Sequence, residues 1–349
     1  MLILSVEEDR KIAKEKMKGY CGVFRECDGD PSRLCQGQSY GRKLGMGGAG
    51  SGASFTNNVK ALAKLNLRMR VVGSHFTPNT EFDLFGKKLT MPIMAASVTG
   101  VNSFGGDEVI TEQDFCKAVV LGSKQAGTIG WRGDTYTYSL KTPYGIEAIE
   151  DAAGWGIKIS KPREQEVIKE FFKKAENANA IAVGVDVDGC GSLIMAKHKK
   201  HVFNKTEEEL KELKRSTKLP FIVKGLMCIE DAKKAVNAGA DAIVISNHGG
   251  RVLDHTPGTA DILPRIVDEL KGKTIILADG GIRTGYDVLK MLALGADGVL
   301  IGRDVIRAAV GGGKDGVQRL FEHYQKTLKK AMKQTQCKTL QDISRDILV

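Results

Sequence analysis

The sequence predicts an α/β fold, a closed (β/α)₈ TIM barrel preceded by a helical, glycine-rich cap segment. Eight short apolar runs occur between residues 91 and 302, and stretches with helical apolar spacing separate them. Strands that are apolar on both faces and alternate with helices are typical of a parallel sheet. Eight such units are the number that closes a barrel.

Each of the eight runs is expected to be one barrel strand. The first four are MPIMAAS (91–97), AGTIG (126–130), GIKIS (156–160) and AIAVGVD (180–186). The other four are PFIVKG (220–225), AIVIS (242–246), TIILADG (274–280) and GVLIG (298–302). The carboxyl ends of barrel strands share one face, which is where barrel enzymes keep their active sites.

Helix signals lie between these runs. PREQEVIKEFFKKAEN (162–177) places Pro162 where a first helical turn accepts proline, and TEEELKELKRS (206–216) offers Thr206 as an N-cap followed by acidic residues. AGADAIVIS (238–246) and LGADGVLIG (294–302) repeat a helix end, a turn and a strand 56 residues apart. The repeat favours a fold built from one unit, although Gly-Ala-Asp also suits any helix–strand junction.

Residues 1–90 are expected to form an N-terminal cap segment and residues 91–349 the barrel. The cap segment holds two helical stretches (5–19 and 55–69), a cysteine-bearing part and the flexible GMGGAGSGAS (45–54). Its apolar surface is too small for an independent core. Cys21, Cys27 and Cys35, with Cys190, would suit zinc or an iron–sulfur cluster, but their spacing matches no tight ligand signature. We therefore predict no metal and reduced thiols.

The charge pattern argues against nucleic acid. A formal net charge of +10 comes from 52 Lys and Arg against 42 Asp and Glu, and these are dispersed except for KHKKH (197–201). Dispersed charge is typical of a solvated surface and suits small anionic substrates. The apolar start MLIL is too short for a signal sequence or a membrane span, so we expect a cytoplasmic protein with no transmembrane segment.

Two sequences predict a phosphate site after strands seven and eight, a common position in barrels. In ADGGIRTG (278–285), Gly280 and Gly281 let backbone N–H groups approach an anion that Arg283 can clamp. In LIGRDVIR (300–307), Gly302 and Arg303 stand at the start of a helix, where the dipole favours negative charge. The alternative is that these are plain turn glycines.

Three further residues at strand ends predict acid–base chemistry on an anionic ligand. Lys224 ends FIVKG (221–225), where burial calls for an anionic partner, either a cofactor that becomes negative or a carboxylate such as Asp279. In SNHGGRVLD (246–254), His248 titrates near neutral pH and Arg251 suits a carboxylate. The glycines between them allow a tight turn that brings both side chains over one small ligand.

SNHGGRVLD, with FIVKG before it and ADGGIRTG and LIGR after it, resembles the FMN-dependent α-hydroxy acid oxidases and dehydrogenases, such as glycolate oxidase and the flavin-type lactate dehydrogenase. The resemblance covers roughly residues 56–349, including LTMPIMAAS (89–97) and CKTLQDIS (337–344). It implies an oxidoreductase with FMN as cofactor that oxidises a small 2-hydroxy acid to the 2-oxo acid by hydride transfer to the flavin. It also implies a homo-oligomer, and it leaves the acid, its chirality and the electron acceptor open.

The resemblance assigns roles to these residues. His248 is the base and Arg251 holds the substrate carboxylate. Lys224 stabilises the reduced, anionic flavin, Ser246 touches the flavin, and Asp279 orients His248 or the surroundings of Arg303. The backbone of Thr99 lines the other edge of the flavin. The FMN phosphate is held by Gly280, Gly281, Arg283, Gly302 and Arg303.

The chain departs from the family at its substrate contacts. The family's N-terminal tyrosine is replaced by Gly48 or a neighbour in GGAGSGA. The family's Gln-x-Tyr becomes Lys158-Ile-Ser160, and its Thr-x-Asp with a following arginine becomes Gly184-Val-Asp186 without one. We expect retained chemistry on a changed substrate, with Lys158 adding charge near the flavin and Arg132 replacing a lost carboxylate contact.

Three alternatives compete with this interpretation. IMP dehydrogenase and GMP reductase share the phosphate block but need a Gly-Ser-x-Cys nucleophile loop, where this chain has SNHGGR (246–251). PIMAASVTG (92–100) resembles type 2 isopentenyl diphosphate isomerase, a non-oxidative FMN barrel. A flavin-binding sensor or partner protein with a decayed substrate site would bind FMN without being reduced by any 2-hydroxy acid.

Overall fold

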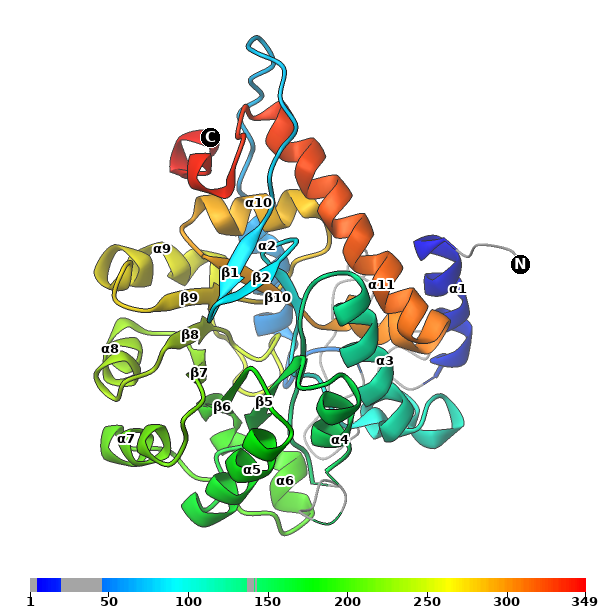
Figure 1. Ribbon diagram of the computed structural model, residues 1–349, viewed down its shortest axis with the longest axis vertical. Helices are drawn as coiled ribbons and strands as arrows, with labels where there is room; N and C mark the ends of the chain where they lie inside the picture. Colours follow the sequence, from blue (N-terminus) through cyan, green and yellow to red (C-terminus); the bar gives the residue numbers. More distant parts are fainter. Residues whose placement is uncertain (1–4, 20–45, 137–140, 142) are drawn as a thin grey trace.

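The computed structural model describes residues 5–19, 46–136, 141 and 143–349, and its centre is a closed parallel barrel (Figure 1). The strands follow one another around it in the order β10-β3-β4-β5-β6-β7-β8-β9. They are β3 (Ile93–Ala95), β4 (Gly130–Arg132), β5 (Gly156–Ser160), β6 (Ala182–Asp186), β7 (Phe221–Leu226), β8 (Ala242–Ile245), β9 (Ile275–Ala278) and β10 (Gly298–Ile301). The predicted barrel is confirmed.

One predicted strand is displaced along the chain. The run AGTIG was expected to be the second strand, but β4 begins at its last residue, Gly130. Gly127 has a left-handed φ of 75° and the Thr128 hydroxyl donates to the Ile93 carbonyl, so the start of the run is the turn that leaves the preceding helix.

A helix follows every barrel strand and covers its outer side (Figure 1). Pro162 precedes its helix, whereas Thr206 forms the expected capping box with Glu209. The last helix breaks at Gly313, whose φ is 59°. The helices are α3 (Glu112–Gln125), α4 (Tyr144–Asp151), α5 (Gln165–Asn177), α6 (Leu193–Lys197), α7 (Glu207–Arg215), α8 (Ile229–Asn237), α9 (Thr259–Leu270), α10 (Gly285–Ala293) and α11 (Arg303–Gln334).

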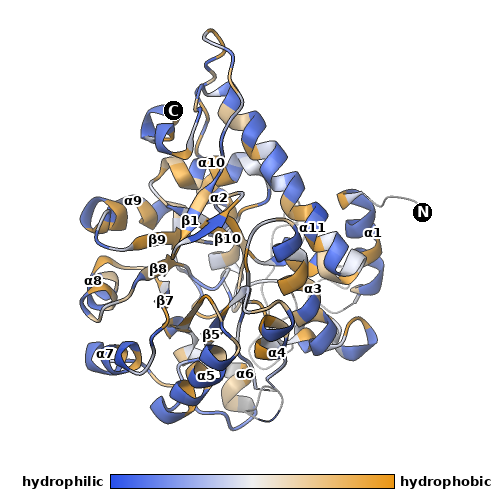
Figure 2. Ribbon diagram, viewed as in Figure 1, coloured by the Kyte–Doolittle hydropathy of each residue, from blue (hydrophilic) through white to orange (hydrophobic). Residues whose placement is uncertain are grey.

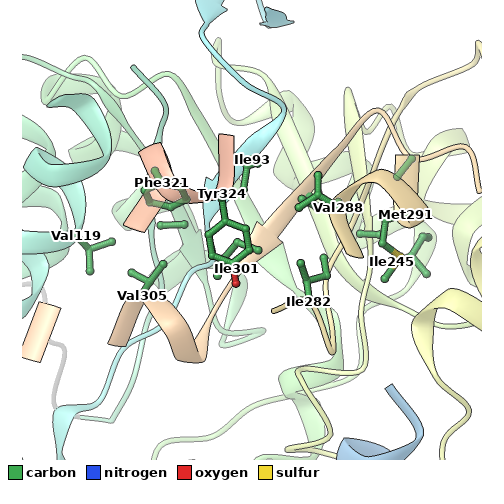
Figure 3. Close-up of a cluster of buried hydrophobic side chains, with 14 of the residues drawn as sticks. Ile93, Val119, Ile245, Ile282, Val288, Met291, Ile301, Val305, Phe321 and Tyr324 are labelled. Atoms are coloured by element: carbon green, nitrogen blue, oxygen red, sulfur yellow. The ribbon is translucent and has the colours of Figure 1, made fainter. Parts of the chain in front are cut away.

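Alternation along the strands separates two apolar layers, because successive strand side chains point to opposite faces. Inward side chains such as Trp131, Ile159 and Leu277 fill the barrel interior. Outward ones pack against the helices, as Figure 3 shows for Ile93 and Ile301 beneath side chains of α11. Polar residues line the outer faces of the helices (Figure 2).

The helices and the hairpin that precede β3 all contact the barrel. Helix α1 (Val6–Lys16) lies beside α11, where Asp9 is paired with Arg319 at 2.9 Å (Figure 1). Helix α2 (Ala53–Ala63) lies at the carboxyl rim, where the amide of its Asn58 bonds that of Asn247. The antiparallel hairpin of β1 (Phe82–Leu84) and β2 (Lys87–Leu89) covers the amino end of the barrel interior. No helix in the described ranges is long and apolar enough to cross a membrane.

Candidate active site

A cavity of about 800 Å³ opens at the carboxyl ends of the barrel strands. The volume lies within the usual range for small-molecule sites, roughly 300–1,000 Å³. Loops from most of the strands contribute to its wall. Of the residues singled out from the sequence, those that line it are Thr99, Lys224, His248, Arg251, Asp279, Gly280, Gly281, Arg283, Gly302 and Arg303.

His248 sits in a turn made of three consecutive left-handed residues. Its φ is 57°, and those of Gly249 and Gly250 are 63° and 79°. A non-glycine residue in this region is strained, and such strain is common at functional sites. A Cβ on Gly250 would lie 2.3 Å from the Phe55 backbone nitrogen, so α2 packs directly on the turn.

The imidazole of His248 is oriented by a carboxylate from another strand. Its Nδ1 lies 3.0 Å from Oδ1 of Asp188 and 3.8 Å from Oδ2 of Asp186. A hydrogen on Nδ1 donated to Asp188 leaves Nε2 as the basic nitrogen. Asp279, expected to orient His248 or the surroundings of Arg303, contacts Lys224 and Ser246.

Asp188 was not predicted from the sequence to belong to this site. It lies in the short 3₁₀ helix Val187–Gly191 that follows β6. Position 225 of β7 must be glycine to leave room for it, because a Cβ on Gly225 would lie 2.4 Å from the carboxyl carbon of Asp188. Burial opposes its charge, but His248 and Lys224 outweigh burial and lower the pKa of Asp188 to about 2. The sequence did contain a signal for it, since Asp188 is a second carboxylate two residues after Asp186, the aspartate that ends β6.

Asp186 belongs to a different pair. Its Oδ2 accepts from Lys161 Nζ at 2.5 Å, and Lys161 also lines the cavity. Asp186, Asp188 and His248 lie close enough to ligate a metal, with one ligand atom from each within 4.8 Å of the others. The ammonium of Lys161 already supplies the countercharge at Asp186.

Lys224 is buried at the cavity floor. Its Nζ donates to Ser246 Oγ at 2.7 Å and lies 3.3 Å from Asp279 Oδ2. Burial lowers the pKa of Lys224, but Asp279 and Asp188 raise it more, so the ammonium stays charged. Lys224 can therefore pair with the Asp279 carboxylate and still face a cofactor in the cavity. Ser246 lies beneath, where its hydroxyl donates to Asp279 and accepts the His248 N–H, and it is absent from the cavity lining.

The cavity also has unmet hydrogen-bonding groups, which fit a phosphate and the hydroxylated chain that carries it. Arg283 Nε and Nη2 are buried and bond to nothing among the described residues, although Nη1 donates to the Ile282 carbonyl. Asp279 Oδ1 is equally unmatched. Gly302 caps α11 with no side chain, which leaves the first-turn N–H groups of that helix directed at the cavity.

The two glycines that follow Asp279 allow close packing against α2. Gly280 and Gly281 have left-handed φ values of 101° and 79°. A Cβ on Gly281 would lie 2.6 Å from the Asn58 carbonyl oxygen, and one on Gly280 would lie 2.9 Å from its side-chain oxygen. They therefore allow α2 to approach the rim.

Arg303, predicted to hold the phosphate, lines the cavity and also donates to backbone carbonyls of the chain. Its Nε donates to the Met46 carbonyl at 2.6 Å, its Nη2 to the carbonyls of Gly47 and Gly249, and its guanidinium stacks over Phe55 at 4.4 Å. Arg251 Nη1 also donates to the Gly47 carbonyl, at 3.3 Å. Arg303 thus ties the segment before α2 to the turn of His248.

Two predictions for the rim are wrong. Arg132 and Lys158 point away from the barrel interior, because Trp131, Ile157 and Ile159 occupy the inward positions of their strands. Arg132 Nη2 contacts Cys116 Sγ at 3.3 Å, and Lys158 Nζ donates to the carbonyls of Gly133 and Ile159. Both side chains lie between strands and helices, so neither faces the cavity.

The cysteines considered as metal or cluster ligands lie mostly outside the residues that the structure describes. Cys21, Cys27 and Cys35 lie outside the described ranges. Cys190 follows Asp188 and is partly buried, and burial raises the pKa of its thiol. A reactive thiolate requires the opposite shift.

The chain is similar to known proteins over most of its length. The family model of the FMN-dependent dehydrogenases matches residues 42–203 and 191–349. A 2-hydroxyacid oxidase of Dictyostelium discoideum is 31% identical over 340 residues, 86% of this chain and 84% of that protein. An L-lactate dehydrogenase of Vibrio cholerae is 51% identical over 130 residues, which is 37% of this chain but only 34% of that enzyme.

Solved structures extend the likeness to the whole chain. A crystal structure of mandelate oxidase superposes with a TM-score of 0.79, is 27% identical and covers 99% of this chain and 98% of its own. The matches favour the oxidative flavin barrels over the isomerase alternative. The chain therefore belongs to the FMN-dependent dehydrogenase family, with FMN as its cofactor, and is an oxidoreductase on a (β/α)₈ barrel.

Proposed function

We propose that this protein oxidises a 2-hydroxy acid to the corresponding 2-oxo acid, with His248 as the base and Arg251 as the partner of the substrate carboxylate. The observation that carries the proposal is that His248, Arg251 and Lys224 line one cavity together with Arg283, whose buried Nε and Nη2 have no partner among the described residues. The family match and the relatives named for 2-hydroxy acid, lactate and mandelate support the same reaction.

Two groups of described residues would contact different parts of FMN. Arg283, the first turn of α11 and Asp279 Oδ1 would hold the phosphate and the hydroxylated chain of FMN. Lys224 would place its ammonium beside the part of the ring that becomes negative. When bound, FMN supplies the acceptor for the two electrons that leave the substrate.

His248 removes one hydrogen as a proton as the C–H and O–H bonds of the hydroxy acid give way to a carbonyl, and the other hydrogen would leave with the electron pair to bound FMN. The imidazolium that results is stabilised by Asp188, whose pKa of about 2 keeps it ionised at neutral pH. Arg251 would fix the carboxylate with a two-pronged hydrogen bond and so orient the substrate carbon. Asp186 stabilises the imidazolium less, because Lys161 neutralises it.

Anaerobic spectroscopy tests the proposal. The purified protein, loaded with FMN, is mixed with single 2-hydroxy acids, and the visible absorbance of the oxidised flavin is followed. Loss of that absorbance with a 2-hydroxy acid, but not with the matching 2-oxo acid, is the expected result. Retained colour with every 2-hydroxy acid would instead favour the flavin-binding sensor or partner protein. Admitting dioxygen after reduction then separates an oxidase from a dehydrogenase, and light scattering on the same sample tests the expected homo-oligomer.

A further inference from the structure

Two stacked rings form part of the wall of the same cavity. Tyr136, in the loop after β4, stacks on His198, which follows α6, with ring centroids 3.6 Å apart and planes 4° from parallel. Both residues line the cavity, as does Asn102, whose Nδ2 donates to the Tyr136 hydroxyl at 2.7 Å. The wall therefore joins the loops that follow β3, β4 and β6.

Buried interactions hold the two loops beside Tyr136 in place. Arg163 donates to both carboxylate oxygens of Asp134 at 2.8 Å and to the Thr135 carbonyl at 2.8 Å, immediately before Tyr136. The Glu112 carboxylate accepts the N–H groups of Gly100 and Val101, immediately before Asn102. A wall built on such anchored loops is formed before a ligand arrives, which lowers the entropic cost of binding.

The chemistry of this wall is aromatic and apolar. Ile194 and Met195 of α6 line the cavity next to the two rings. Met195 is almost fully buried, and a thioether makes favourable contacts with aromatic rings. The cation of this side, Lys161, is neutralised by Asp186 at 2.5 Å, so a second substrate carboxylate is not favoured here.

We propose that Tyr136 and His198 form the subsite for the side chain of the 2-hydroxy acid and select acids that carry an aryl group. The inference rests on the proposed function, because His248 and Arg251 must hold the hydroxyl-bearing carbon and the carboxylate for the side chain to reach this wall. Aromatic rings gain more from such a wall than their area alone provides. Small acids such as lactate leave the wall unused.

Equilibrium binding tests the subsite without turnover. Phenylpyruvate and pyruvate differ only by the phenyl group, and their binding to the FMN-loaded protein is followed through the flavin spectrum. We expect phenylpyruvate to bind about tenfold more tightly than pyruvate. We expect Tyr136→Ala and His198→Ala to reduce that ratio to about threefold or less, and Tyr136→Phe to keep it, since the ring remains.

His201→Ala is the matched control. His201 lies three residues beyond His198 and also faces an aromatic ring, that of Phe203, with centroids 6.4 Å apart, but it does not line the cavity. Its substitution should leave the ratio unchanged. Equal binding of the two acids to the unaltered protein, or an unchanged ratio in both alanine variants, would overturn the subsite.

Reduction of FMN by phenyllactate and by lactate separates the two proposals. If lactate reduces the flavin and the alanine variants do not discriminate, the subsite is wrong and the proposed function stands. If neither acid reduces it but phenylpyruvate still binds through the two rings, the subsite stands and the proposed function fails.

Discussion

His248 Nδ1 lies 3.0 Å from Oδ1 of Asp188, a residue two positions beyond the aspartate that ends β6. The pair joins a strained, left-handed turn after β8 to a short 3₁₀ helix after β6. Asp186, at the strand end itself, is 3.8 Å from the same nitrogen and is committed to Lys161. The orienting role therefore belongs to Asp188.

Asp188→Asn should slow flavin reduction by roughly 10²–10⁴-fold, because an amide neither fixes the Nδ1–H tautomer nor stabilises the imidazolium. Asp186→Asn is the matched control and should have a much smaller effect. Anaerobic stopped-flow reduction with one 2-hydroxy acid measures both. A larger loss for Asp186→Asn than for Asp188→Asn would assign the orienting role to Asp186.

Arg283→Met should weaken FMN binding by about 10- to 100-fold, because two buried charge-assisted donors are lost from the phosphate end. Riboflavin has no phosphate and provides the comparison ligand. Fluorescence quenching on titration of the protein gives both dissociation constants. An equal loss of affinity for riboflavin and FMN would show that Arg283 does not meet the phosphate.

The lowered pKa of Lys158 should make the free energy of unfolding depend on pH. Burial lowers its pKa from 10.5 to about 8, so between these values the unfolded chain binds a proton that the folded chain has released. The free energy of unfolding contributed by this group therefore rises as the pH increases from 8 to 10.5, by on the order of 3 kcal/mol in total.

Urea unfolding of the protein and of Lys158→Met at several pH values isolates this contribution. The difference in unfolding free energy between them should shift in favour of the unaltered protein across that window and stay constant below pH 8. A difference that does not change with pH would mean that Lys158 titrates as it does in water.

Gly250→Ala should destabilise the protein by at least about 3 kcal/mol, because a left-handed residue gains a Cβ against the backbone of α2. Gly272→Ala is the control, since its φ of 84° is similar but nothing lies within 4 Å of the added carbon. The control should cost only about 1–2 kcal/mol. Equal losses of unfolding free energy for the two variants, measured by urea unfolding, would show that the contact with α2 adds nothing to the cost of the left-handed backbone.

The strand repeat and the turn sequences were sufficient to predict the barrel and the rim. Apolar runs such as AIVIS are typical of buried strands when helices flank them, and polar residues at the carboxyl ends of such strands gather at one face. His248, Lys224 and Arg283 were found in this way.

Side-chain direction was the part that the sequence did not reveal. Arg132 and Lys158 were expected at the cavity, but a shift of one residue in strand register moves a side chain to the other face. Here Trp131 and Ile157 take the inward positions. Asp188 was missed for a related reason, since only the 3₁₀ turn after Asp186 carries it back to His248.

Long-range backbone contacts were equally hidden. Arg303 stands where a phosphate clamp was expected, yet its donors reach carbonyls of residues 46, 47 and 249. Nothing in LIGR indicates that Met46 and Gly47, more than 250 residues earlier, supply two of those carbonyls.

The rate of flavin reduction in His248→Ala tests the account most directly. With FMN bound and a 2-hydroxy acid that reduces the unaltered protein, we predict a reduction rate lower by roughly 10²–10⁴-fold, with FMN affinity nearly unchanged. A variant that reduces its flavin as fast as the unaltered protein would contradict the assignment of His248 as the base.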